Sequence, residues 1–277
     1  MFVYADNAAT TCVSKTAREA MMPYLTERYG NPSSLHSVGQ RAKEALDAAR
    51  ETVAQCLGCE PREIIFTSGG SEADNQAIIS AAKLGAKKGK KHIISTKFEH
   101  HAVLHTLKKL EKEGWEVTLL DVHEDGVVRV DELRDAIRED TCLVTVMFAN
   151  NEIGTVQPIT EIGAICRERG VPFHTDAVQA AGHMPIDVKA MNIDMLSMSG
   201  HKFHSPKGVG VLYVKRNIPL LSLIEGGTQE RGKRAGTENM AGIVALAAAL
   251  KESCDNMEVN NAKIIPMRDK LFAELSK

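Results

Sequence analysis

The stretch EIIFTSGGSEADNQAIISAAKLGAK, residues 63–87, joins a short β-rich run to a segment of helical period. The same alternation continues along the chain, because short apolar runs are followed by stretches whose apolar residues recur every three or four positions. This pattern predicts an α/β fold in three layers, a mainly parallel sheet with helices on both faces. We expect strands at 63–67, 91–96, 116–120, 142–148, 171–175 and 193–198, and helices at 72–87, 101–113, 131–138 and 159–169.

The last third of the chain completes the sheet and adds helices. The alternating, glycine-bearing run GVGVLYV at 208–214 predicts one more strand. A basic, glycine-rich loop follows at 226–236, then an apolar helix at about 238–254 and an amphipathic helix from about residue 260. The length of 277 residues suits one large domain, alone or with an appendage.

The composition is that of an ordinary globular protein. Hydrophobic residues make up 43% and charged residues 25%, and 34 basic against 36 acidic side chains leave a net charge of −2. These values disfavour disorder and a nucleic-acid-binding stripe. The longest apolar run, 240–250, is far shorter than the roughly 20 residues of a membrane helix, and the first residues do not resemble a signal peptide. We therefore expect a cytoplasmic protein with neither a membrane nor a nucleic-acid partner.

The six cysteines, at 12, 56, 59, 142, 166 and 254, follow no disulfide spacing, so we expect reduced thiols. Cys56 and Cys59 have the spacing of half a zinc site, but no second pair completes it. We interpret Cys56 as a small apolar residue at a helix end and Gly58 as the C-cap of that helix. No metal site is expected.

Polar residues follow the predicted strands. In parallel α/β sheets, ligands bind at the carboxyl ends of the strands. Those positions hold SGGS at 68–71, EHH at 99–101, NNE at 150–152 and Asp176. The sequence therefore predicts a functional site at this edge of the sheet.

The SGGS turn at 68–71 has the features of an anion site. Two glycines between a strand and a helix leave free backbone N–H groups at the helix N-terminus, which suit a phosphate. Ser71 and Asp74 also have the spacing of a capping box, so a purely structural role is the alternative. No GxGxxG follows a strand, and the P-loop-like run at 227–234 ends in Arg234 where Ser or Thr is needed. We reject a nucleotide site.

Asp176, Gln179 and Lys202 supply further chemistry at the same edge. Asp176 and Gln179 can project from one turn after a strand, and Lys202 comes just after the last parallel strand. A single lysine is usually a surface charge. A phosphate cradle, a carboxylate and an amine together, however, are what pyridoxal 5'-phosphate requires, because the anion keeps the ring nitrogen protonated and the amine forms a Schiff base.

Eight segments closely resemble the NifS-like cysteine desulfurases of the class V aminotransferase group, which are fold type I transferases dependent on pyridoxal phosphate. The resemblance implies that L-cysteine is converted to L-alanine while the sulfur stays on the enzyme as a persulfide, for an acceptor protein such as an iron–sulfur scaffold. The segments are DNAATT (6–11), YGNPSS (29–34), FTSGGSEADN (66–75), EHHAVLHT (99–106), NNEIGTVQP (150–158), HTDAVQAAG (174–182), SGHKFHSPKGVGVLYV (199–214) and RAGTEN (234–239).

The resemblance also implies a role for each matching residue around the cofactor ring. Lys202 would carry the cofactor as a Schiff base, and Asp176 would pair with the ring nitrogen. Gln179 would hydrogen-bond the phenolic oxygen, and His100 would stack on the ring and act in catalysis with Lys202. Asn151 would lie near the ring oxygen and the substrate carboxylate. For His100, a capped surface position is the alternative.

The phosphate group has its own set of implied contacts. One member, Thr237, would reach across a homodimer to the phosphate in the partner subunit. The others would bind the phosphate of their own subunit and are Gly70, Ser71, Ser199 and His201.

The chain departs from the family pattern on its C-terminal side. In these desulfurases the persulfide cysteine lies on a mobile loop beyond the last helix, and a small C-terminal domain supplies an arginine for the substrate carboxylate. None of the six cysteines matches that position, and we interpret Cys12 as a buried thiol. We expect an N-terminal segment near the active site (1–20), a cofactor-binding large domain (21–255) and the start of a helix (256–277) that leads to a mostly absent small domain.

Three hypotheses remain open. The chain is the cofactor-binding portion of a cysteine desulfurase, another lyase or aminotransferase of the same fold that uses Lys202 alone, or a non-catalytic remnant. The missing arginine counts against the second, and the intact Lys202, Asp176 and His100 count against the third. We also expect exposed apolar surface on the last helix, at Ile264, Leu271 and Leu275.

Overall fold

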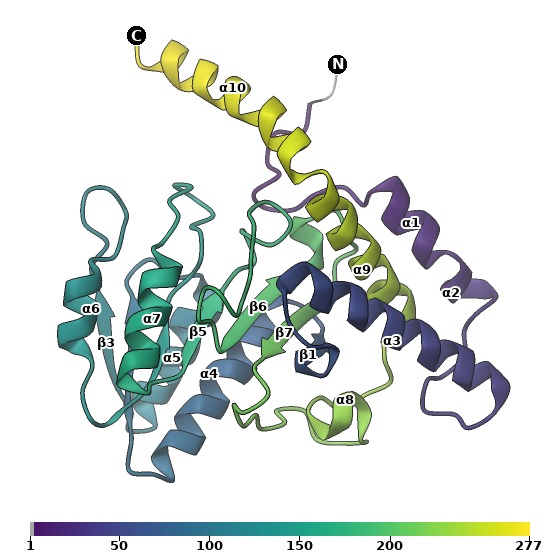
Figure 1. Ribbon diagram of the computed structural model, residues 1–277, viewed down its shortest axis with the longest axis horizontal. Coiled ribbons are helices and arrows are strands. Elements are labelled where there is room, and N and C mark those ends of the chain that lie inside the picture. Colours follow the sequence, from purple (N-terminus) through teal and green to yellow (C-terminus); the bar gives the residue numbers. More distant parts are fainter. Residues whose placement is uncertain (1–2) are drawn as a thin grey trace.

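A seven-stranded sheet forms the centre of the computed structural model, which describes residues 3–277 (Figure 1). The strand order is β1-β7-β6-β5-β4-β2-β3. β7 is antiparallel to both of its neighbours, and the other strand pairs are parallel, so the predicted fold class is confirmed. The strands are β1 (Ile64–Thr67), β2 (His92–Thr96), β3 (Glu116–Leu120), β4 (Thr141–Thr145), β5 (Phe173–Asp176), β6 (Met195–Ser199) and β7 (Gly210–Val214).

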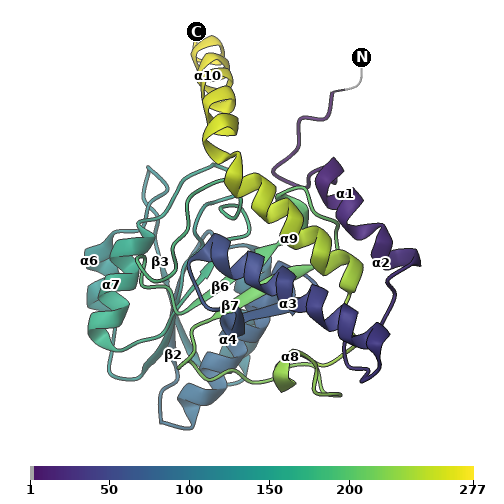
Figure 2. The same cartoon turned by 45° about the vertical axis from the view of Figure 1, so that its right-hand side comes forward.

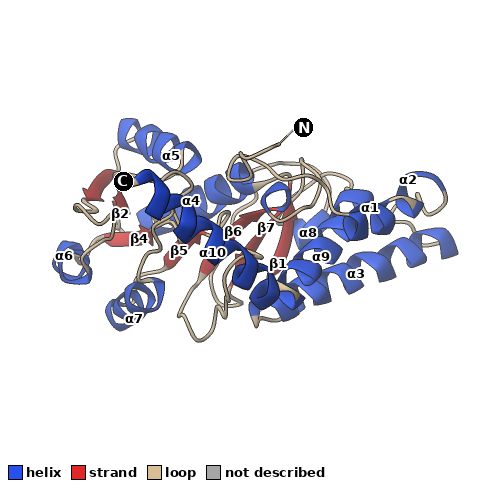
Figure 3. Ribbon diagram, turned by 90° about the horizontal axis from the view of Figure 1, so that it is seen from above, coloured by secondary structure: helices blue, strands red, loops and turns tan. Residues whose placement is uncertain are grey.

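Helices cover both faces of the sheet, and Figure 3 shows α5 and α7 on opposite sides of it. The α-helices are α1 (Lys15–Met21), α2 (Pro23–Thr26), α3 (Ser37–Leu57), α4 (Gly70–Ala86), α5 (His101–Lys112), α6 (Val130–Ala136), α7 (Ile159–Arg169), α8 (Gln229–Gly232), α9 (Met240–Asp255) and α10 (Met257–Leu275). Two short 3-10 helices, η1 (Pro61–Glu63) and η2 (Gly200–Lys202), adjoin strands β1 and β6.

The three layers follow from the alternation of side chains along each strand. Ile64 and Phe66 of β1 belong to a core that also contains residues of α3, α6, α7 and α9, whereas Ile65 belongs to a second core with α4 and α5. On β7, Val211 and Leu212 divide between the two cores in the same way. Successive strand residues point to opposite faces, so continuously apolar strands fill both cores at once.

Glycine and asparagine end or begin the helices where the backbone requires them. Gly58 has φ +70° and is the C-cap of α3, as the sequence predicts, and Cys56 lies in the last turn of that helix. The Asn239 side chain accepts a hydrogen bond of 3.1 Å from the Gly242 N–H at the start of α9. Such caps satisfy backbone groups that have no partner within the helix.

A buried ion pair fixes the loop at 226–236, where the sequence predicts no regular structure. Arg50 of α3 makes two bonds of 2.7 Å to the Glu230 carboxylate, and both side chains are buried. Glu230 also accepts from the Phe66 N–H at 3.1 Å and has φ +47°, within the short helix α8. Glu230 therefore holds α3, β1 and the loop together.

Helix α10 projects away from the sheet and its covering helices (Figure 2). None of its residues is buried. Ile264, Leu271 and Leu275 are exposed, as predicted, and so are Met267 and Phe272, so the exposed apolar surface is larger than expected. Among the described residues, no helix combines the length and the apolar character that a membrane crossing requires.

Candidate active site

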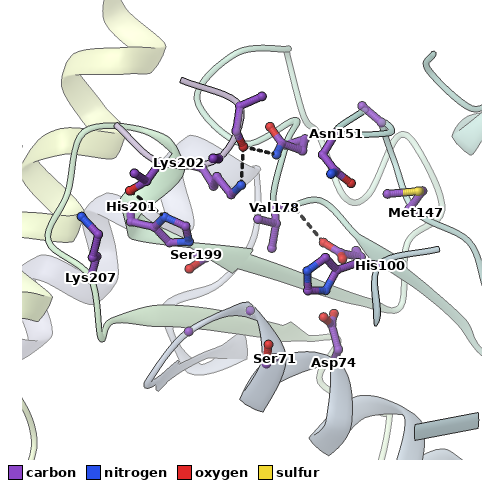
Figure 4. Close-up of a pocket in the computed structure, with 18 of the residues that line it drawn as sticks. Ser71, Asp74, His100, Met147, Asn151, Val178, Ser199, His201, Lys202 and Lys207 are labelled. Atoms are coloured by element: carbon purple, nitrogen blue, oxygen red, sulfur yellow. Dashed lines mark hydrogen bonds between the residues drawn. The ribbon is translucent and has the colours of Figure 1, made fainter. Parts of the chain in front are cut away.

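A cavity of about 720 Å³ lies at the carboxyl ends of the parallel strands. It is lined by elements far apart in sequence: the segment after residue 5, the start of α4, the loop after β5 and η2 after β6 (Figure 4). The structure brings nine of the ten predicted site residues to this one cavity. They are Gly70, Ser71, His100, Asn151, Asp176, Gln179, Ser199, His201 and Lys202.

The N-terminus of α4 forms one wall. The N-cap is Gly69, which has no side chain that could accept a hydrogen bond from the helix. The first N–H groups of this 17-residue helix therefore lie at the cavity with no side-chain acceptor. A Cβ on Gly70 would lie 2.6 Å from Cγ2 of Val178, which lines the same cavity. Glycine is therefore needed where the helix approaches the opposite wall, and the helix terminus suits an anion.

The capping box predicted from Ser71 and Asp74 is wrong. Both residues lie inside α4, whose N-cap is Gly69, and Asp74 is buried against the cavity. Glu72, in the first turn, accepts a hydrogen bond of 2.9 Å from the Ser68 N–H, which precedes the N-cap, and pairs with Arg234 at 2.8 Å. The first N–H groups of the helix thus keep no side-chain cap, and Ser71 and Asp74 line the cavity.

Asp176 ends strand β5 and is only 4% exposed. Its Oδ1 accepts a bond of 2.9 Å from the Val178 N–H, which fixes the carboxylate in the cavity wall. Burial raises the pKa of the Asp176 carboxyl, while the charges of His100 and Lys202 oppose this shift. A cation placed against Asp176 would therefore stabilise the ionised form.

Lys202 lies in η2, the turn that follows β6. Its Nζ donates to the Ala8 carbonyl, which also accepts a bond of 2.9 Å from Nε2 of Gln179. Burial lowers the pKa of the Lys202 amine, and the charges of Asp176 and Asp6 oppose this. A lowered pKa increases the fraction of neutral amine, which is the nucleophilic form.

Three side chains that line the cavity lie close together. One ligating atom each from Asp74, His100 and Asp176 lies within 4.8 Å of the others, and Figure 4 shows the Asp74 carboxylate directed toward the His100 ring. His100 is also the N-cap of α5, and its Nδ1 accepts from the Ala102 N–H at 3.1 Å. His100 is thus both a capping residue and a cavity residue, and Nε2 is left to carry the proton of the neutral ring.

A buried polar layer supports this wall. Oδ1 of Asp74 and Oε2 of Glu99 are buried and have no hydrogen-bond partner within residues 3–277. Burial raises the pKa of Glu99 to about 8. Burial also raises the pKa of Asp74, with a further contribution from the charge of Asp176. His174 behaves oppositely, since burial lowers its pKa to about 3 and keeps the ring neutral.

One predicted residue lies elsewhere. Thr237 is exposed and lines a smaller cavity, which shares the lining residues Ser68 and Gly208 with the first. This cavity holds no other residue of the predicted site. Thr237 does not line the first cavity itself, and its contact with the phosphate of a partner subunit stays a prediction.

Several cavity residues have no chemical role in the sequence analysis. The most important is Asp74, for which the sequence predicts only a capping role, although its spacing from Ser71 places both on one helical face. The backbone carbonyl of Ala8 is another, and no sequence signal predicts a carbonyl contact. Met147 and Val178 complete the apolar part of the wall.

The buried position predicted for Cys12 is wrong, because Cys12 is exposed. The buried neighbour is Thr11, whose N–H and Oγ1 both donate to the His201 carbonyl, at 2.9 and 2.8 Å. In an extended segment, successive side chains point to opposite sides, so docking of Thr11 turns Cys12 outward.

The sequence matches the family model described as aminotransferase class-V over residues 3–271. The chain belongs to this family. Within the class-V aminotransferases, it is 56% identical over 270 residues to the "Cysteine desulfurase IscS" of Clostridium botulinum, covering 98% of this chain and 68% of the relative. It is 54% identical to the protein of the same name from Methanosarcina thermophila, covering 99% and 68%. These relatives confirm the resemblance to NifS-like cysteine desulfurases.

Solved structures of the class-V aminotransferase family have the same fold. A "NIFS-LIKE PROTEIN" superimposes with a TM-score of 0.97 at 41% identity, covering all of this chain and 76% of the other. "SspA in complex with cysteine" superimposes with a TM-score of 0.86 at 44% identity, covering 90% and 72%. The three-layer fold is therefore that of the NifS-like proteins.

Proposed function

We propose that this chain binds pyridoxal 5'-phosphate in the 720 Å³ cavity and forms the cofactor-binding portion of a cysteine desulfurase that acts on L-cysteine. One observation carries the proposal: the Lys202 amine, the Asp176 carboxylate and the uncapped N-terminus of α4 all face this cavity. The names of the relatives support the reaction, and the solved complex of one neighbour with cysteine supports the substrate.

The residues present fit this cofactor. The close approach of Gly70 to Val178 leaves a side-chain-free helix terminus for a phosphate, and the buried Asp176 suits a protonated ring nitrogen. Asp74 would add a second buried carboxyl to the wall that holds the cofactor. The proposed phosphate ligands are Gly70, Ser71, Ser199 and His201, and Gln179 and Asn151 are placed to contact the ring oxygen and the substrate carboxylate.

When bound, pyridoxal phosphate supplies an aldehyde carbon for amines and a ring that accepts electrons from the substrate. The protein supplies orientation and proton transfer. Lys202 is the attachment point, and the Ala8 carbonyl orients its amine. His100 lines the cavity and its Nδ1 is fixed by the Ala102 N–H, so its Nε2 would be the atom that holds or donates a proton to the substrate.

The cofactor assignment is tested by visible absorption of the purified protein with added pyridoxal phosphate. We expect the absorption of lysine-bound cofactor in the wild type and its loss in Lys202→Ala. Lys207→Ala is the matched control, because Lys207 lines the same cavity but is exposed. A band that survives in Lys202→Ala, or is equally lost in Lys207→Ala while both variants keep the wild-type circular dichroism, would overturn the assignment.

The reaction is tested separately with L-cysteine and an added thiol as sulfur acceptor. Within residues 3–277 no cysteine lines the cavity, so the added thiol takes that role in the assay. Alanine and sulfide in equal amounts would support a desulfurase. Turnover of other amino acids without sulfide would support a different lyase or aminotransferase, and cofactor binding with no turnover would support a non-catalytic role.

We also propose that the protein acts as a homodimer in which Thr237 completes the partner's phosphate site. The exposed position of Thr237 outside its own cavity supports this, and so do large exposed apolar side chains at Leu25, Tyr29 and Leu35. An iron–sulfur scaffold as sulfur acceptor stays a prediction from the resemblance, and a cytoplasmic location stays a prediction from the sequence.

A further inference from the structure

Two thiols, Cys56 and Cys254, line a second cavity that is distinct from the Lys202 site. This cavity has a volume of about 480 Å³ and shares no lining residue with the first. Cys56 lies in the last turn of α3 and Cys254 in the last turn of α9. Both are partly buried against the same core. The two helices thus bring residues about 200 positions apart to one wall.

Both thiols line this cavity at the ends of helices α3 and α9, which pack against each other. The proximity of Cys254, together with burial, raises the pKa of Cys56, while the proximity of Cys56 lowers the pKa of Cys254. Lys251, one turn before Cys254, also favours the Cys254 thiolate, and Asp255 opposes it. One thiol beside a more acidic partner is the arrangement found in reactive dithiols.

The surroundings allow a small molecule to reach the pair. The cavity is lined by apolar side chains, among them Met184, Ile186 and Leu250, and by the carboxylates of Asp255 and Glu258. The other cysteines do not share this setting. Cys59 is outside the cavity, Cys142 and Cys166 are buried, and Cys12 is exposed.

We propose that Cys56 and Cys254 form a dithiol site that is oxidised to an intramolecular disulfide by low-molecular-weight disulfides. The Cys254 thiolate attacks one sulfur of the small disulfide, which forms a mixed disulfide and releases one thiolate. The Cys56 thiol then loses its proton and attacks the Cys254 sulfur, which releases the second thiolate. The protein loses two electrons and two protons, and the small disulfide is reduced to two thiols.

The test uses the full chain with Cys12→Ser, which removes the exposed thiol, treated with oxidised glutathione in native buffer. Remaining thiols are then blocked with N-ethylmaleimide in acid, and the products are mapped by mass spectrometry. We expect two fewer maleimide adducts and a link between peptides 51–62 and 252–263. Trypsin leaves Cys56 and Cys59 on the same peptide, so the mapping is repeated with Cys59→Ser, which should keep the link.

Cys56→Ser should instead trap one glutathione on Cys254 and form no link. Circular dichroism checks that each variant is folded. The proposal is overturned if the link disappears in Cys59→Ser but persists in Cys56→Ser, if glutathione adducts accumulate separately on Cys56 and Cys254, or if neither thiol reacts. Limiting iodoacetamide on the reduced protein gives a second readout, because Cys254 should be alkylated at least several-fold faster than Cys56.

Discussion

At the scale of single residues, the site combines groups whose chemistry the sequence reveals with groups whose environment it hides. Asp176 and Lys202 could be predicted because each follows a strand of a parallel sheet, and that position alone places both at one edge. For Asp74 the sequence predicts a capping role, because the same spacing from Ser71 fits both a capping motif and a pair of cavity residues. Only the packing of α4 against β5 and β6 distinguishes the two.

Glu99 gives a prediction about pH. Its carboxyl is 5% exposed, and its Oε1 accepts bonds from Thr96 Oγ1 at 2.7 Å and from the Met147 N–H at 2.9 Å. Burial raises the pKa of Glu99 from its usual 4.5 to about 8. Between these values the unfolded chain loses its proton first, so the free energy of unfolding should fall as pH rises from about 4.5 to about 8.

Glu99→Gln removes this proton and keeps the Oε1 acceptor. The variant, without cofactor, should gain stability relative to wild type steadily between pH 5 and pH 8, as measured by urea unfolding. Glu116→Gln is the control, because the bond to Arg138 holds the pKa of exposed Glu116 below its usual value of 4.5, so its stability difference from wild type should not change between pH 5 and pH 8. Parallel pH profiles for wild type and Glu99→Gln would show that the Glu99 carboxyl is ionised in the folded protein.

At the scale of elements, helix α4 has two tasks, since it fills the second core and presents its N-terminus to the cavity. Both follow from the sequence, because alanines recur on the buried face and glycines precede the first turn. The ion pair of Arg50 with Glu230 could not be predicted. Its partners are 180 residues apart, and the left-handed backbone of Glu230 occurs at a residue type that rarely adopts it.

Gly70→Ala tests the α4 terminus. The added methyl would meet the branched, stiff side chain of Val178 at 2.6 Å, and such overpacking costs about 1–3 kcal/mol. We expect pyridoxal phosphate affinity to fall about tenfold or more in absorption titrations. Gly89→Ala serves as control for the added methyl, because Gly89 has open space around its Cβ position and differs from Gly70 in having a left-handed backbone. That variant should lose about 1 kcal/mol of stability and keep its cofactor affinity.

Glu230→Ala tests the ion pair. Removing the carboxylate leaves the Arg50 guanidinium buried and unpaired, so the free energy of unfolding should fall by about 3–5 kcal/mol. Asp47→Ala breaks the exposed pair with Lys43 on the same helix α3 and should cost only about 0.3–0.5 kcal/mol. Equal losses in the two variants, measured by chemical denaturation, would contradict a structural role for the buried pair.

At the scale of the whole molecule, the three-layer order of helices and sheet can be predicted from the sequence. The surfaces that contact another subunit cannot. Leu35 is 91% exposed and Tyr29 is 77% exposed on the loop before α3. Large apolar side chains exposed close together are typical of a protein–protein interface. If this loop lies in the homodimer interface, Leu35→Asp should shift the protein toward monomer in light scattering at fixed concentration. Leu119→Asp, on the edge strand β3, should leave the mass unchanged.

The contact between the first residues and η2 also has a consequence for synthesis. Thr11 bonds to the His201 carbonyl, 190 residues later in the chain. At about 5–20 residues per second, the ribosome needs about 10–40 s to produce the second partner after the first. During that time the exposed start of the nascent chain has no docking surface, so chaperones and proteases have access to it. Proteolysis of stalled nascent chains should therefore remove this segment until residue 202 has left the exit tunnel.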